Sequence, residues 1–318
     1  MEIRNIAIIA HVDHGKTTLV DQLLKKSDTL SSRENIEERA MDSNDLERER
    51  GITILAKNTA IKYKGYKINI LDTPGHADFS GEVERIMKMV DGVILVVDAY
   101  EGAMPQTRFV LKQALENNLK PIVVINKVDK PSARPDEVVD EVLDLFIELG
   151  ANDDQLDFKV AYASATHGTS SLSSDINTQE PTMDYILDLI ISEIPAPEAS
   201  VDGYLQFQGA LLDYNDYVGR MAIGRIKRGI MKQNEIVSCM RNDGSIKQFR
   251  IQKLYSFLGL QKSEVESAEA GDIVAVAGLA DINVGETLCN VGHEEALPPI
   301  RVSEPTVEMY FSTNDSPF

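Results

Sequence analysis

Residues 10–17 read Ala-His-Val-Asp-His-Gly-Lys-Thr, and this stretch decides how the first part of the chain folds. It follows an apolar run, Ile3 to Ala10, that predicts a buried strand, and it leads into a helical pattern from Thr18 onward. A strand that turns into a helix in this way presents backbone N–H groups and a helix N-terminus to an anion. Lys16 adds a point charge for the β- and γ-phosphates of a nucleotide, and Thr17 adds a hydroxyl for Mg²⁺. The stretch therefore predicts a phosphate-binding loop.

The same residues alone also fit an ordinary strand-to-helix turn, because Gly15-Lys16-Thr17 is short and Ala10 stands where such loops begin with glycine. Three later motifs argue against that alternative, because each one follows an apolar strand pattern. They are Asp72-Thr73-Pro74-Gly75-His76 after Ile68 to Leu71, Asn126-Lys127-Val128-Asp129 after Ile122 to Ile125, and Ser164-Ala165 after Val160 to Ala163. Four motifs in this order, each at the end of a strand, favour one nucleotide site.

Each later motif supplies a group that a guanine nucleotide can use. The carboxylate of Asp72 suits a water-mediated contact with Mg²⁺, and the Gly75 amide can reach the γ-phosphate. The carboxylate of Asp129 can accept hydrogen bonds from N1 and N2 of guanine, which adenine cannot donate. The backbone of Ser164 and Ala165 can meet the guanine O6. An enzyme that uses ATP is the alternative, and Asp129 argues against it.

These motifs carry a resemblance to a known family that covers the whole chain. Arg50-Gly51-Ile52-Thr53-Ile54, Asp72-Thr73-Pro74-Gly75-His76 and Asn126-Lys127-Val128-Asp129 resemble the translational GTPases, the elongation-factor family. Within that family, Ala10 with Asp13-His14, the stretch Val128 to Pro135 and Phe146-Ile147-Glu148-Leu149-Gly150-Ala151 resemble the TypA/BipA subfamily of ribosome-associated GTPases. A LepA-like or elongation-factor-G-like translation factor is the alternative within the family.

The resemblance implies a GTPase that hydrolyses GTP to GDP and phosphate as a ribosome-activated switch in translation or ribosome assembly. His76 matches the catalytic residue, and Val12 and Ile52 match a hydrophobic gate that shields it. Thr17 and Thr53 would hold Mg²⁺ directly and Asp72 through water. The predicted nucleotide-binding residues are Asp13, His14, Gly15, Lys16, Thr17, Thr18, Gly75, Asn126, Lys127, Asp129, Ser164 and Ala165; Lys16 is also a predicted catalytic residue.

Two further expectations follow from the resemblance. Asp13 matches a loop aspartate that is associated with a monovalent cation in some relatives. The charged segment Ser31 to Gly51, which precedes Thr53, is predicted to be a switch loop that GTP orders, and its Glu47-Arg48-Glu49-Arg50 also fits a solvated helix face. A nucleotide switch with negligible turnover is the alternative from another class of function, and His76 argues against it.

Composition limits the partners. The net charge of −19 does not predict RNA binding, because a basic footprint is its usual sign. The nearest approach to a basic patch is Arg220, Arg225, Lys227, Arg228 and Lys232, which also fits a solvated strand face. The ribosome, and rRNA contact by the full-length protein, are therefore implied by the resemblance alone. Two cysteines without close spacing favour plain thiols in a reduced, cytoplasmic compartment, and no segment reaches membrane-spanning length, so we expect no membrane partner. We also expect a monomer.

The pattern of elements predicts two domains and the start of a third. Residues 1–197 alternate apolar strands with helices, which indicates an α/β GTP-binding (G) domain with a mostly parallel sheet covered on both faces. Residues 198–300 show short strands punctuated by glycine, typical of a small antiparallel β-barrel. Residues 301–318 begin a strand, Val307 to Ser312, that has no partner left. Because the family continues with further domains, we expect a truncated third domain here.

The predicted helices are Lys16 to Lys25, Phe79 to Val90, Pro105 to Asn117, Pro135 to Leu149 and Met183 to Glu193. Thr53 to Tyr63 and Tyr66 to Asp72 are predicted to form an antiparallel hairpin, and His167 to Pro181 an exposed loop. In the second domain the predicted strands are Tyr204 to Leu211, Val218 to Lys227, Glu235 to Met240, Ser245 to Leu254 and Ile273 to Ala277.

Overall fold

The computed structural model describes residues 1–27, 56–74, 80–300, 310, 312 and 313. Several predictions fall outside these residues: the switch segment Ser31 to Gly51, the gate residue Ile52, the metal ligand Thr53, and Gly75 and His76. Of the predicted third-domain strand Val307 to Ser312, only Tyr310 and Ser312 are described.

The first seven strands form one sheet in the order β2-β3-β1-β4-β5-β6-β7. The central five strands are parallel, and β2 and β7 join the two edges antiparallel. Their bounds are β1 (Glu2–Ala10), β2 (Lys57–Tyr63), β3 (Tyr66–Asp72), β4 (Gly92–Asp98), β5 (Lys120–Asn126), β6 (Lys159–Ser164) and β7 (Thr169–Ser171). The predicted hairpin of β2 and β3 is confirmed, with Lys64 and Gly65 at positive φ in its turn.

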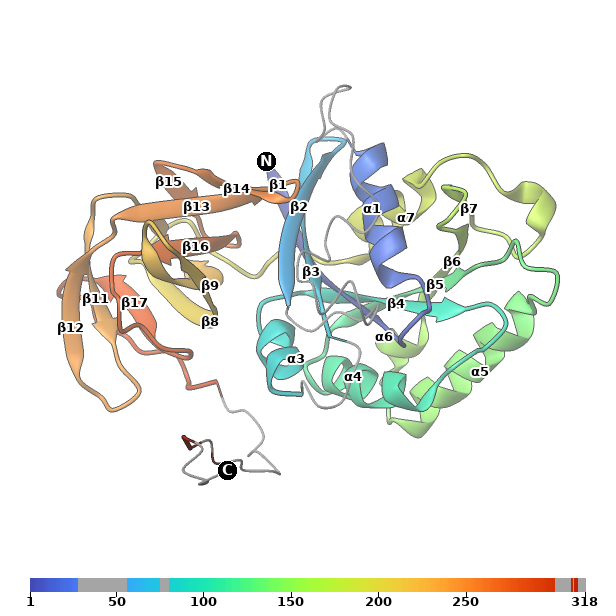
Figure 1. Ribbon diagram of the computed structural model, residues 1–318, viewed down its shortest axis with the longest axis horizontal. Helices are drawn as coiled ribbons and strands as arrows, with labels where there is room; N and C mark the ends of the chain where they lie inside the picture. The colour runs from blue at the N-terminus through green and yellow to red at the C-terminus, as the bar shows by residue number, and fades with distance from the viewer. Residues whose placement is uncertain (28–55, 75–79, 301–309, 311, 314–318) are drawn as a thin grey trace.

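Helices cover both faces of this sheet (Figure 1). They are α1 (Lys16–Lys26), α3 (Ser80–Met87), α4 (Pro105–Glu116), α5 (Pro135–Glu148), the short α6 (Asp153–Leu156) and α7 (Asp184–Glu193), with a 3₁₀ turn over Ile176–Thr178. α4 and α5 begin with Pro105 and Pro135, because a proline in the first turn lacks only an N–H that would have no helical partner. None of the described helices is long and apolar enough to cross a membrane.

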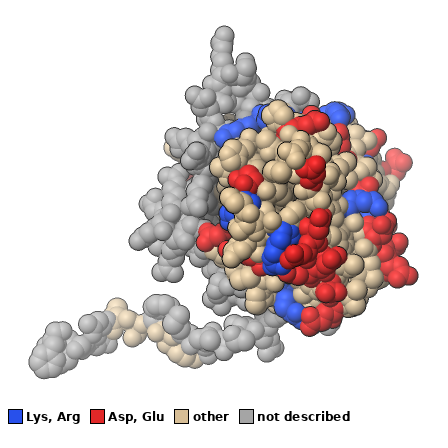
Figure 2. All heavy atoms as spheres, turned by 90° about the vertical axis from the view of Figure 1, so that its right-hand side faces the viewer, with Lys and Arg blue, Asp and Glu red and all other residues tan. Residues whose placement is uncertain are grey.

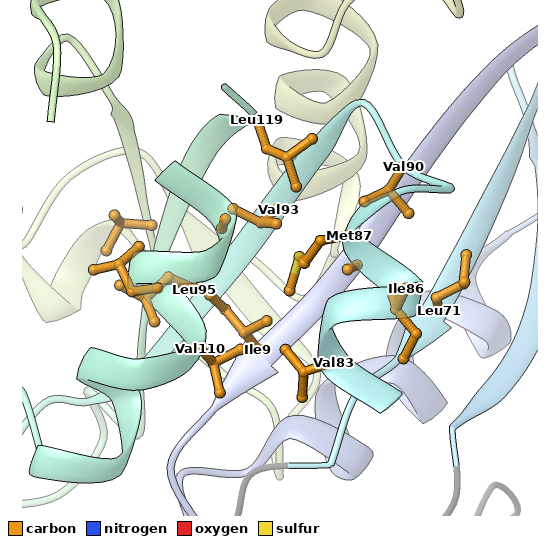
Figure 3. Packing of buried hydrophobic residues seen from close by; sticks show 14 of the residues in the cluster. Ile9, Leu71, Val83, Ile86, Met87, Val90, Val93, Leu95, Val110 and Leu119 are labelled. Carbon is orange, nitrogen blue, oxygen red and sulfur yellow. The ribbon is translucent and has the colours of Figure 1, made fainter. Parts of the chain in front are cut away.

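Alternation along the strands divides the core into two layers. Ile9 of β1 and Leu95 of β4 pack against α3 and α4, where Val83 and Val110 meet them (Figure 3). Their neighbours in sequence face the other side of the sheet, where the apolar residues of α1 and α7 cover them. Since successive strand residues point to opposite faces, an uninterrupted apolar run is what a strand covered on both sides requires.

The second domain is a curled, barrel-like antiparallel sheet in the order β12-β11-β17-β8-β9-β16-β13-β14, with a separate pair β10-β15. The strands are β8 (Gln206–Asn215), β9 (Gly219–Arg228), β10 (Ile230–Lys232), β11 (Ile236–Met240), β12 (Ile246–Arg250), β13 (Lys253–Leu258), β14 (Gln261–Glu264), β15 (Ser267–Glu269), β16 (Ile273–Ala277) and β17 (Thr287–Asn290). The predicted fold class, a mostly parallel α/β domain followed by an antiparallel barrel-like domain, is confirmed.

Two local predictions are wrong. The run Ser245 to Leu254 is two strands, because the chain leaves β12 at Ile251 and pairs again in β13 with β16. The segment His167 to Pro181 is not wholly an exposed loop, since β7 pairs with β6 and the side chains of Ser170 and Ser171 are buried. Polar composition predicted a loop there, yet each of these serine hydroxyls has a partner, Thr182 O or Thr178 Oγ1.

The two domains meet at a largely buried polar cluster, which we call the domain joint: Asn5, Lys67, Asn69, Asp91, Arg225 and Asp272. Lys67 of β3 pairs with Asp272 (Nζ–Oδ1 2.7 Å), and Arg225 of β9 pairs with Asp91 (Nη1–Oδ1 2.8 Å). Beside it, the edge strand β2 forms a bridge to Gly259 in the β13–β14 turn (Figure 1). The joint therefore ties the parallel sheet directly to the barrel-like sheet.

The joint also changes how the basic residues of β9 are interpreted. Arg225 is buried, and the partly exposed Lys227 donates to the backbone carbonyl of Lys88 across the domain contact, so the two do not form a freely solvated strand face. Arg228 pairs with Glu295, and Arg220 donates to the carbonyl of Ile282. The expected patch is therefore not one continuous basic surface. The face of the molecule opposite the barrel-like domain is largely uncharged, and its charged side chains are more often acidic than basic (Figure 2).

Candidate functional site

The predicted motifs meet at one edge of the parallel sheet, where the carboxyl ends of β1, β3, β5 and β6 lie together. In such a sheet, the crevice beyond the strand ends is where ligands bind. The residues that follow these ends are the loop 11–15, Thr73, Lys127 to Asp129 and Ala165.

The loop between β1 and α1 has the geometry of an anion site. Gly15 has φ +90°, and a Cβ atom there would lie 2.4 Å from Nδ2 of Asn126, so only glycine fits. Gly15 precedes the first residue of α1 and offers no capping side chain, and the first turn holds no acidic residue. The N-terminal amides of α1 are therefore not capped by a side chain of this loop.

Lys16 and Asp72 form a buried ion pair at the mouth of this loop. The Lys16 Nζ atom lies 2.6 Å from Asp72 Oδ1, and it also donates to the carbonyl of Thr73. Asp72 is fully buried, while Thr17 lies beside Lys16 at the start of α1. A carboxylate and a hydroxyl are the oxygen donors that hard divalent cations prefer, so these residues fit Mg²⁺.

No group of three or more His, Cys, Asp or Glu side chains among the described residues could hold a metal ion. Within that part of the chain, a cation at Asp72 and Thr17 would need further oxygen ligands from a nucleotide or water.

Asn126 joins three of the motifs. Its Nδ2 donates to the carbonyl of His14 at 2.9 Å, and its Oδ1 accepts from the backbone N–H of Ala165 at 3.0 Å. The side chain is buried at the end of β5, so both bonds are shielded from water. One amide thus fixes the phosphate-binding loop relative to the Ser164-Ala165 segment.

His14 lies in this loop, but its side chain faces the protein. The ring is buried, with Nδ1 3.4 Å from the carbonyl of Val96 and Nε2 3.2 Å from Oε2 of Glu101. Burial, followed by the charge of His11, lowers the pKa of His14, so the ring is neutral at pH 7. If His14 contacts a nucleotide, it can therefore do so only through its backbone.

Asp129 lies beside a residue that sequence reasoning missed. Its Oδ2 is 3.6 Å from Nδ1 of His167, which in turn lies 2.9 Å from the Ser164 hydroxyl. The side chain of Asp129 is 35% exposed, which leaves room for its carboxylate to accept hydrogen bonds from a ligand. His167 lies two residues beyond the motif Ser164-Ala165, and nothing in the sequence pattern there marked it as a site residue.

Asp98 is the second residue that sequence reasoning missed. It ends β4 and is fully buried, with Oδ2 2.8 Å from Nζ of Lys127 and 3.1 Å from Nζ of Lys130. A signal was present: the apolar run Val93 to Val97 ends at this aspartate, as other runs end at Asp72 and Asn126.

The remaining predicted residues differ in how far they are exposed. Thr18 and the gate residue Val12 are half-buried, and the side chain of Asp13 is exposed while its carbonyl accepts from Lys127. Asp13 and Lys127 both have φ of 65°, which is unusual for residues other than glycine. Such backbone strain collects at functional sites. Ile52, Thr53, Gly75 and His76 are not among the described residues.

Comparison with known proteins gives two family matches. Residues 1–196 match the family model described as the elongation factor Tu GTP binding domain, and residues 219–289 match elongation factor Tu domain 2. The chain is similar to proteins named large ribosomal subunit assembly factor BipA. It is 65% identical to the one from Bacillus subtilis (strain 168) over 317 residues and 57% identical to the one from Escherichia coli (strain K12).

The protein of the same name from Haemophilus influenzae is 56% identical over 318 residues. These alignments cover all of this chain, but 51–52% of each relative. The chain therefore spans about half the length of the relatives that it matches.

Proposed function

Since the chain belongs to the family of the elongation factor Tu GTP binding domain, we propose that it binds GTP and GDP at the edge of its parallel sheet and hydrolyses GTP. One observation carries the proposal: Asn126 hydrogen-bonds both the phosphate-binding loop at His14 and the segment at Ala165. A nucleotide that bridges these two motifs would have its phosphates at the first and its base at the second.

We assign the predicted residues to these two ends of the nucleotide. The phosphates would meet the amides of Asp13 to Thr18, the Lys16 ammonium and, from outside the described residues, the Gly75 amide. The base would meet the carboxylate of Asp129, with Asn126, Lys127 and the backbone of Ser164 and Ala165 around it. The opening of Asp129 to solvent supports this assignment.

Mg²⁺ is the cofactor that the donor set at α1 fits. Thr17 and Thr53 would hold it directly and Asp72 through water; when bound, it supplies positive charge that neutralises the phosphate oxygens. The burial of Lys16 and Asp72 supports charge neutralisation at the phosphates, because charges act more strongly where water is excluded. We assign a monovalent cation, by resemblance alone, to the neighbourhood of Asp13.

Hydrolysis is assigned to His76, which would orient the attacking water once the gate formed by Val12 and Ile52 opens. The relatives are named as assembly factors of the large ribosomal subunit, which supports a ribosomal particle as the activator. We propose that the protein is a monomer and that rRNA contact, implied by the resemblance alone, is made by the full-length protein. The excess of acidic over basic side chains on the face in Figure 2 supports placing that contact elsewhere.

Base choice tests the binding half of the proposal. Asp129→Asn should weaken GTP binding by about 2–4 kcal/mol, because the guanine N1 and N2 donors lose their acceptor. The same variant should bind xanthosine triphosphate better than the parent does, since that base presents an oxygen to the new amide. Calorimetric titration with both nucleotides measures this, and Asp144→Asn on the exposed face of α5 is the matched control. Unchanged GTP binding in Asp129→Asn contradicts the guanine assignment.

Turnover tests the catalytic half. In a full-length protein, His76→Ala should leave nucleotide affinity unchanged and lower hydrolysis stimulated by ribosomal particles by at least about 10²-fold. Without ribosomal particles, the chain should turn over far more slowly than once per second, because a transition-state contact is missing. Phosphate release with and without particles measures both rates. A parental rate in His76→Ala rules out the catalytic role, and negligible stimulated turnover in the parent favours a non-hydrolysing switch.

A further inference from the structure

Asp98 lies at the centre of the candidate site without belonging to any motif assigned above. It is the last residue of β4, between β1 and β5, and its side chain has no exposure to solvent. A carboxylate buried to this extent is costly unless its charge is paired and its oxygens are hydrogen-bonded. The arrangement of its partners therefore shows what the charge is used for.

Both oxygens of Asp98 are engaged. Oδ1 accepts from the backbone N–H of Tyr100 at 2.8 Å, which fixes the turn after β4. Oδ2 faces two ammonium groups, Lys127 Nζ at 2.8 Å and Lys130 Nζ at 3.1 Å. Burial alone raises the pKa of Asp98, but the hydrogen bonds from Lys127, Tyr100 and Lys130 outweigh it and hold the pKa well below its ordinary value. Asp98 is thus a permanent negative charge.

The two lysines are the ends of one turn. The backbone N–H of Lys130 donates to the carbonyl of Lys127 at 3.2 Å, and Asp129 lies inside this turn. Lys127 also donates from Nζ to the carbonyl of Asp13, so its side chain reaches from Asp98 to the phosphate-binding loop. One buried carboxylate therefore contacts both ends of the turn that carries the proposed base acceptor.

We propose that Asp98 is a positioning residue for guanine selectivity, acting by anchoring the turn 127–130 and, through Lys127, the phosphate-binding loop. The inference rests on the proposed binding of guanine nucleotides. Asp98 has no contact with the base in this scheme. It removes freedom from the turn before the nucleotide arrives, so that the carboxylate of Asp129 meets the N1 and N2 donors of guanine without reordering.

The decisive variant is Asp98→Asn. The amide keeps the size of the side chain and an oxygen for the Tyr100 N–H, but it removes the charge that holds both lysines. We expect GDP to bind at least about tenfold more weakly. Inosine diphosphate lacks the N2 donor and uses Asp129 less, so it should lose less affinity than GDP does. The preference for GDP over inosine diphosphate should therefore fall several-fold.

Two further variants separate positioning from a general loss of fold. Lys130→Met leaves the pair of Asp98 with Lys127 intact and should give a smaller change in the same direction. Asp157→Asn removes an exposed carboxylate that pairs with Lys159 at 3.1 Å, and it should change neither affinity nor preference. In an Asp129→Asn background, Asp98→Asn should no longer affect the preference, because the group that it positions is gone.

Competition of each diphosphate against a fluorescent GDP analogue gives all of these affinities. A parental preference for GDP in Asp98→Asn overturns the proposal, and so does an equal loss for both nucleotides, which would mean that Asp98 only supports the fold. If Asp98→Asn does not fold, an unchanged preference in Lys130→Met overturns it. Failure of the parent protein to bind GDP is a different result, because it refutes the proposed function itself.

Discussion

Lys227 is a positive charge placed where the protein does not favour one. It lies on β9 in the contact between the two domains, next to Arg225 and against the carbonyl of Lys88. Burial, followed by the charge of Arg225, lowers the pKa of Lys227 to about 8. In the unfolded chain a lysine titrates near about 10.4, so between these values the unfolded state binds more protons and folding stability rises with pH.

Lys227→Met should therefore be more stable than the parent at pH 7, by about 1–3 kcal/mol, because the variant carries no partly desolvated charge at this position. The advantage should shrink as pH rises from 8 towards 10, where the folded parent has already lost the proton. Urea denaturation of both proteins across this range measures the difference. Lys232→Met, at an exposed position on β10, is the control and should show no such trend. A difference that does not change with pH would contradict the lowered pKa.

At the scale of residues, sequence alone predicted those site residues that stand in a short motif after an apolar strand. Lys16, Asp72 and Asn126 each follow an apolar strand, and the structure brings them to one sheet edge. Asp98 follows such a strand too, but no motif spacing marked it, because its partners Lys127 and Lys130 lie on a different strand end. A long-range ion pair leaves no periodic signal.

At the scale of elements, β2 contacts the barrel-like domain directly. It is an edge strand of the parallel sheet, and an unpaired edge would expose backbone hydrogen-bonding groups. Here the carbonyl of Ala60 accepts from the N–H of Gly259 at 2.7 Å, and the hydroxyl of Thr59 donates to the carbonyl of Gly259. The barrel-like domain thus covers part of this edge.

Thr59→Val should destabilise the protein by about 1–3 kcal/mol, because valine keeps the shape of the side chain but leaves the buried carbonyl of Gly259 without its donor. Thr59→Ser is the matched variant, since it keeps the hydroxyl and loses only a methyl group. Guanidinium unfolding of the three proteins gives the order of stability, with serine expected above valine. The reverse order would mean that packing of the methyl group, rather than the hydrogen bond, holds β2 to the second domain.

Element prediction succeeded where burial is periodic and failed where polar side chains satisfy one another. The helices from Pro105 and Pro135 begin where the sequence indicates, because proline at the first turn is a local signal. β7 was missed because its strand consists of Thr169, Ser170 and Ser171, whose hydroxyls all find partners within the fold. Hydropathy cannot distinguish such a segment from a solvated loop.

At the scale of the whole molecule, nothing in the sequence indicated the contacts in the domain joint. Lys67 and Asp272 are 205 residues apart in the chain, and each alone fits an ordinary surface charge. Folding buries them together with Asn69, whose Nδ2 lies 3.1 Å from Asp272 Oδ1. The charges become partners only after both sheets have formed, so their interaction is a property of the assembled fold.

The joint should decide whether the two domains unfold together. Asp272 accepts from Lys67 with both oxygens, at 2.7 and 2.8 Å, and the side chains of the pair are 11% and 12% exposed. Asp272→Asn leaves the Lys67 ammonium buried without its counter-charge, which typically costs about 3–5 kcal/mol. Lys67→Met combined with Asp272→Asn removes both charges and should recover part of that loss, because no unpaired ion remains.

Differential scanning calorimetry measures this coupling directly. We expect one transition for the parent, and for Asp272→Asn an earlier transition that separates the barrel-like domain from the parallel sheet. The double variant should move the two back towards one. Asp202→Asn, an exposed aspartate in the segment before β8, should leave the trace unchanged. Because the joint contacts β3, whose end holds Asp72, a loosened joint that also weakened GDP binding would show that the second domain stabilises the nucleotide site. A single transition at the parental temperature in Asp272→Asn would instead mean that the apolar contacts of the interface suffice to couple the domains.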